Sequence, residues 1–201
     1  AHEHAHPLTE NETVRSSRYL QVELSPDFRF DNRQSAIENR KPKIVQMLAL
    51  LADKLCPYAP REIFANEMTI ASGFAGALLH LDRRTMVQAS HGVVGRAELR
   101  RQLQQEVTQG KLTPATADLL LLIGDLLGYL DLALEVAPFY RSGRENDARE
   151  LETILETALF PHLEPQVLRA YTALREQYIA LRADLTPAEL MAWGEGVLHI
   201  L

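Results

Sequence analysis

Five side chains in the middle of the chain have the chemistry to bind a metal ion or a small polar ligand: His80, His91, Asp125, Tyr129 and Asp131. Imidazole nitrogens and carboxylate oxygens are common ligands of zinc and other transition metals. We therefore treat these residues as a candidate ligand-binding set. The alternative is that the histidines are hydrogen-bonded residues at helix ends, and that the tyrosine is a core residue with its polar tip at the surface.

A second group of candidate metal ligands lies at the N-terminus, where His2, His4 and His6 alternate with other residues. Three imidazoles at this spacing converge on one divalent ion only if the segment is extended or folds back on itself. The group is either a physiological metal site or an incidental, tag-like cluster. We expect weak binding without structural consequence.

Motifs for nucleotide binding and for several kinds of catalysis are absent from the chain. It contains no GxGxxG, no Walker A loop and no GxSxG pattern, and each of these would place specific groups at a phosphate or a nucleophile. Neither Glu67 nor Glu106 is followed by a histidine three residues later, as helical di-iron sites require. The residues point to no particular cofactor.

The composition argues against two further classes. The chain has 201 residues and a formal net charge of -6, and its arginine clusters are interleaved with acids. Nucleic-acid-binding domains are typically basic, so we expect no nucleic-acid partner. The single cysteine, Cys56, excludes an internal disulfide. We interpret Cys56 as a buried core residue, the alternative being a reactive thiol near Lys54.

The most apolar stretch, residues 119–137, is long enough to cross a bilayer but contains Asp125, Asp131 and Glu135. Each acid near the centre of a membrane helix costs roughly 2.5–3.5 kcal/mol. We therefore predict a buried helix and no membrane span. The first residue, Ala1, fits either removal of an initiator methionine or cleavage of a signal peptide. The compartment stays open, with the cytoplasm slightly favoured.

Hydrophobic periodicity predicts an all-α, single-domain bundle of about seven helices. We expect a flexible polar arm at residues 1–17 and one helical domain at residues 18–201. Alternating apolar and polar residues at about 18–31 predict a short β-hairpin, or an irregular segment that lays its apolar side chains into a groove. The expected helices cover about 42–56, 60–80, 96–109, 114–137, 148–159, 165–183 and 187–198.

Glycine, proline and capping residues mark the expected helix ends. Gly92 and Gly95 predict a break, and Pro138 predicts the end of the long apolar helix. Thr113 is a candidate N-cap, and capping-box patterns begin at Asp147 and Thr186, each with a glutamate three residues later.

The long apolar helix has two distinctive surfaces. Asp118, Leu122, Asp125 and Tyr129 lie along one stripe, because successive residues of a helix are about 100° apart. Another surface carries glycines at positions 124 and 128, which we expect to dock closely against the small-residue segment that holds glycines 73 and 76. The alternative is that the glycines leave room for a flat ligand.

These observations favour a non-catalytic binding or regulatory module that acts through protein–protein or small-ligand contacts. A homodimer or another protein partner is expected, because an unpaired hairpin edge and extra apolar helix faces are often covered by association. The alternative is a helical enzyme or sensor with a metal or small ligand near His80, His91, Asp125 and Asp131.

Overall fold

The computed structural model describes residue 5, residues 11–18, residue 20 and residues 41–200. These residues are mostly helical and contain no strand, which confirms the all-α class. The predicted hairpin at residues 18–31 lies outside the described residues, except for Arg18 and Leu20, neither of which is in a strand. Within the predicted flexible arm, residues 12–17 form a short helix whose side chains Thr13 and Val14 are buried. That part of the arm prediction is wrong.

Helices follow one another through the described residues, in places with only a few residues between them. The elements in chain order are α2 (Glu12–Ser17), α4 (Lys41–Asp53), the π-helical turn η2 (Lys54–Tyr58), α5 (Ala59–Thr69), the π-helical turn η3 (Ile70–Phe74), α6 (Ala75–Thr108), α7 (Pro114–Tyr129), α8 (Leu132–Arg141), α9 (Glu145–Ala158), the 3₁₀ turn η4 (Phe160–His162), α10 (Pro165–Ile179) and α11 (Pro187–Leu198). In this part of the chain, no helix is apolar over enough length to traverse a bilayer.

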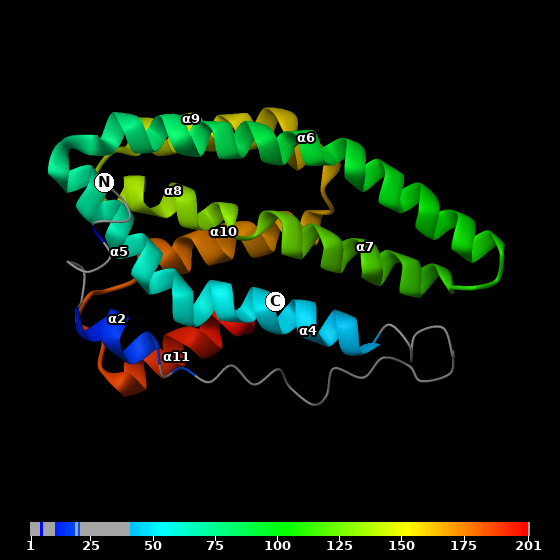
Figure 1. The fold of residues 1–201 in the computed structure, drawn as a ribbon, viewed down its shortest axis with the longest axis horizontal. Helices are drawn as coiled ribbons and strands as arrows, with labels where there is room; N and C mark the ends of the chain where they lie inside the picture. The colour runs from blue at the N-terminus through cyan, green and yellow to red at the C-terminus, as the bar shows by residue number, and fades with distance from the viewer. Residues whose placement is uncertain (1–4, 6–10, 19, 21–40, 201) are drawn as a thin grey trace.

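The helices form an elongated bundle around α8 (Figure 1). This short helix packs against α5, α9 and α10, and seven of its ten side chains are buried. Helix α9 runs along the first part of α6, whereas the second part of α6 and α7 form a helical hairpin that extends away from the rest (Figure 1). A main core cluster gathers around α8, and a smaller one fills the far end of the hairpin.

Three predicted helix boundaries are wrong. Helix α6 continues through Gly92 and Gly95. The predicted helix 114–137 is divided between α7 and α8, and Pro138 lies inside α8 rather than beyond its end. A proline in a helix interior costs about 3 kcal/mol, and burial of most of α8 offsets this cost. Helix α9 starts two residues before Asp147, which lies in its first turn and pairs with Arg144.

Other local predictions are confirmed. The Thr113 side chain caps α7, and Thr186 and Glu189 form the complete capping box at the start of α11. Cys56 is 1% exposed. Its burial, and then the charge of Asp53, raise the pKa of the thiol to about 12, so it is a core residue and not a reactive one.

The predicted docking of glycine against glycine does not occur. Gly73 has a φ of +88° at the kink between η3 and α6, where a residue with a side chain would be strained. Among the described residues, no atom of a neighbouring segment lies within 4 Å of the position of an added Cβ at Gly76 or Gly128. Of these four glycines, Gly124 faces another helix most closely, since an added Cβ there would lie 3.3 Å from Leu99 Cδ2 of α6.

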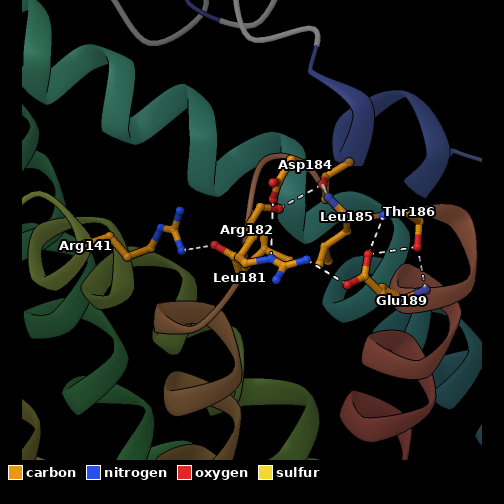
Figure 2. Close-up of polar contacts among 8 residues, drawn as sticks. Arg141, Leu181, Arg182, Asp184, Leu185, Thr186 and Glu189 are labelled. Atoms are coloured by element: carbon orange, nitrogen blue, oxygen red, sulfur yellow. Dashed lines mark hydrogen bonds and ion pairs between the residues drawn. The ribbon is translucent and has the colours of Figure 1, made fainter.

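Polar contacts hold the loop between α10 and α11 (Figure 2). The Arg141 guanidinium donates to the carbonyls of Ile179, at 2.9 Å, and of Leu181. Thr13 of α2 donates its hydroxyl to Arg182 O at 2.8 Å and accepts the Leu185 N–H at 3.0 Å. These contacts satisfy backbone groups that would otherwise be left without partners, and they join α2 and α8 to the loop. Their role is structural.

Candidate functional site

The structure divides the predicted ligand-binding set among three places. Asp125 and Tyr129 lie together beside Arg96, whereas Asp131 belongs to a second charged cluster with Lys54. His80 and His91 are both exposed on α6, and among the described residues neither makes a hydrogen bond or an ion pair. In the same part of the chain, no three His, Cys, Asp or Glu side chains are arranged to hold a metal ion.

The first cluster is a buried ion pair that joins the two helices of the α6–α7 hairpin. Arg96 Nε donates to both carboxylate oxygens of Asp125, at 2.8 and 3.0 Å, and Arg96 Nη2 donates to Oδ2 at 2.9 Å. The two side chains are only 8% and 3% exposed. Burial raises the pKa of Asp125, while the hydrogen bond and the charge of Arg96 act in the opposite direction. A forked pair of this kind fixes both side chains in one geometry.

Neighbouring residues extend this cluster to α10 and along α7. Glu164, directly before α10, accepts from Arg100 Nη2 at 2.7 Å and lies 3.6 Å from Arg96 Nη2. Tyr129 is buried one turn beyond Asp125, and burial followed by the charge of Asp125 raises the pKa of its hydroxyl. The predicted stripe on α7 therefore does bring Asp125 and Tyr129 together.

A groove of about 520 Å³ lies beside this cluster, between α6, α7 and the start of α10. Its apolar wall is made by Leu103, Ala117, Leu121 and Leu122, and its charged groups are Arg100, Asp118 and Glu164. Asp118 and Leu122 belong to the stripe predicted on α7. The groove therefore combines an apolar surface with charged groups, and two of these charges belong to the network around Arg96.

The second cluster gathers four carboxyl groups and one lysine between η2, α5, α6 and α8. Lys54 Nζ lies 2.5 Å from Asp131 Oδ2, directly before α8. Asp82 of α6 is 2% exposed and is hydrogen-bonded to Glu135 of α8. Asp131 and Glu62 also act on Glu135 through their charges.

The pKa values of Asp82 and Glu135 are both raised. Burial, and then the charge and hydrogen bond of Glu135, raise the pKa of Asp82 to about 9. Burial, and then the charge of Asp131, raise the pKa of Glu135. Two neighbouring carboxyl groups, of which Asp82 is buried, disfavour the state in which both are ionised, and this favours the protonated form of the pair. Asp82 Oδ2 has no hydrogen-bond partner among the described residues.

Sequence reasoning missed the partners in both clusters. Asp82 lies between Leu78 and Met86 on a buried face of α6. The spacing of four residues on either side of Asp82 is visible in the sequence and indicates an acid on an apolar helix face. The predicted break at Gly92 and Gly95 separates Arg96 from the first part of α6, whereas the helix continues through both glycines. No pattern in the sequence pairs it with Asp125.

The N-terminal histidines 2, 4 and 6 lie outside the described residues. The same segment also matches the pattern His-Glu-x-x-His, from His2 to His6. On a helix this pattern places two imidazoles on one face. Weak binding of a divalent metal ion by this segment, without structural consequence, stays a prediction.

The geometry leaves the groove and the Asp82–Glu135 pair as the two features with functional potential. Comparison of the chain with family models, with curated proteins and with solved structures found no match.

Proposed function

We propose that this protein is a non-catalytic binding module that takes a small ligand in the groove between α6, α7 and α10. The observation that carries the proposal is the groove itself, with its volume of about 520 Å³. Sites for small molecules typically measure roughly 300–1,000 Å³, and they combine an apolar wall with a few placed polar groups. The groove has such a volume, and three leucines and one alanine line it beside three charged side chains and two glutamines.

The surroundings of the groove favour binding without large rearrangement. The Arg96–Asp125 pair joins α6 to α7 directly behind the groove, and Glu164 connects this pair to the start of α10. All three helices that form the walls are therefore tied together before a ligand arrives. A preformed site of this kind loses little conformational entropy on binding, which improves affinity.

A fragment screen with a blocked variant tests the proposal. Gln104 lines the groove from α6, whereas its neighbour Gln105 does not, and both are exposed. Gln104→Trp should fill the groove and abolish the fragment hits seen by ligand-observed NMR. Gln105→Trp, which adds the same side chain one residue away, should leave these hits unchanged. If no fragment binds the parent, or if both variants behave alike, the groove is not the binding site.

The enzyme or sensor alternative remains a hypothesis with less support. Asp125 and Asp131 are each paired with a cation, Arg96 and Lys54, and a metal ion would have to displace it. Metal analysis of the protein after removal of residues 1–8 tests this alternative. Stoichiometric zinc that is lost in the Asp125→Asn variant would favour it over the binding module.

A further inference from the structure

We propose that the ligand of the groove is a small organic cation with an apolar body, such as an alkyl or aryl amine. This inference rests on the proposed function, because it assigns a chemical class to the occupant of the same groove. Two observations support it. After the ion pairs around the groove are counted, one negative charge remains, and the carboxylate that carries it, Asp118, lies beside Leu121 and Leu122.

The positive charges at the groove are already neutralised. Among its lining residues, Arg100 carries the cationic charge and is hydrogen-bonded to Glu164 at 2.7 Å. Arg96, directly behind, is bound by Asp125 through three hydrogen bonds. An anionic ligand would therefore have to compete with Glu164 for Arg100, and its charge would lie close to the Glu164 and Asp118 carboxylates.

One negative charge is left over. Asp118 lines the groove from α7, and its carboxylate makes no hydrogen bond or ion pair with the residues that the structure describes. Arg100 contributes +1, and Asp118 and Glu164 contribute -1 each, so the charges that line the groove sum to -1. A cationic ligand restores neutrality and gains a charge-assisted hydrogen bond at Asp118.

The apolar wall begins next to this carboxylate. Leu121 and Leu122 follow Asp118 by three and four residues on α7, so the three side chains lie on one side of the helix. Leu121 is buried and belongs to the cluster at the end of the hairpin, together with Leu103 and Ala117. An ammonium group at Asp118 would place an attached hydrocarbon chain along these leucines. Gln104 and Gln166 add amide groups that can accept further hydrogen bonds.

Three probes of the same chain length test the charge requirement: hexylamine, hexanol and hexanoate. We expect NMR titrations of the full chain to rank their affinities in that order. Asp118→Asn should weaken hexylamine about two- to fivefold, since an exposed ion pair contributes little, and should leave hexanol unchanged. Asp53→Asn changes the net charge equally at an exposed position outside the groove, so it should leave hexylamine binding as in the parent.

The outcomes separate this inference from the proposed function. If hexanol or hexanoate binds as tightly as hexylamine, and Gln104→Trp blocks it, the groove is a binding site but its ligand is not selected by positive charge. Equal weakening of hexylamine by Asp118→Asn and Asp53→Asn also overturns the inference, since the protein's overall charge then explains the effect. If neither the probes nor any fragment binds, both the function and its ligand class are refuted.

Discussion

Replacing Asp82 with asparagine tests whether a proton is stored in the core of this bundle. Asp82 is 2% exposed, and its pKa is raised from 3.8 to about 9. The pKa of the folded state is therefore higher than that of the unfolded chain. The stability that the protonated Asp82 contributes is fully present below about pH 4 and is lost as the pH rises toward about 9.

The size of the change in the free energy of unfolding with pH follows from the proton that unfolding releases. Between pH 5 and pH 8, Asp82 is protonated in the folded protein and ionised in the unfolded chain, so unfolding releases one proton. The free energy of unfolding then falls by about 1.4 kcal/mol per pH unit, or about 4 kcal/mol over the whole interval. This is a large part of the roughly 5–15 kcal/mol that stabilises a typical domain. An asparagine keeps the size and hydrogen-bonding capacity of the side chain but cannot ionise.

Urea denaturation followed by circular dichroism at pH 5, 6, 7 and 8 measures the effect. The free energy of unfolding of the parent should fall more steeply with pH than that of the Asp82→Asn variant. The difference between the two should change in favour of the variant by about 1.4 kcal/mol with each pH unit. Asp118→Asn, which changes an exposed acid of α7, should keep the slope of the parent. If the parent and Asp82→Asn give parallel lines over this interval, the one-proton difference assigned to Asp82 is refuted.

Three further predictions concern packing, the buried ion pair and association. Arg96→Ala should destabilise the protein by about 3–5 kcal/mol because it leaves Asp125 buried without its cation; a denaturation midpoint close to that of the parent would mean that the pair is not buried in solution. An added Cβ at Gly92 would lie 2.9 Å from Tyr129 Oη, so Gly92→Ala should lower the melting temperature of the parent. In the Tyr129→Phe background, which lacks that oxygen, the same change should be neutral or stabilising by up to about 1 kcal/mol. If Gly92→Ala lowers the melting temperature equally in both backgrounds, the contact with Tyr129 is contradicted. The homodimer expected from the sequence stays a prediction, and sedimentation at micromolar concentration should give a dimer. The Val94 side chain on α6 is 77% exposed, so Val94→Glu should weaken the dimer if α6 forms the interface. A strictly monomeric parent would refute it.

Features that depend on neighbouring residues in the chain could be predicted from the sequence alone. The helical class follows from apolar side chains repeating every three or four residues. The starts of α7 and α11 follow from Thr113 and Thr186, whose hydroxyls reach backbone N–H groups within the same turn. The alignment of Asp118 with Asp125 follows from helix geometry alone. Each of these properties is decided within about two helical turns.

Features that depend on contacts between distant segments were decided by the tertiary structure. Gly92 marks the place where α6 passes the Tyr129 hydroxyl, and not a helix end. The pKa of Asp82 is raised because Asp82 is buried between helices and because Glu135, 53 residues later in the chain, lies beside it. Arg96 meets Asp125 because α6 and α7 run side by side in one hairpin (Figure 1). Burial and charge pairing are set by the spatial neighbours of a group, and the spacing of residues along the chain does not specify those neighbours.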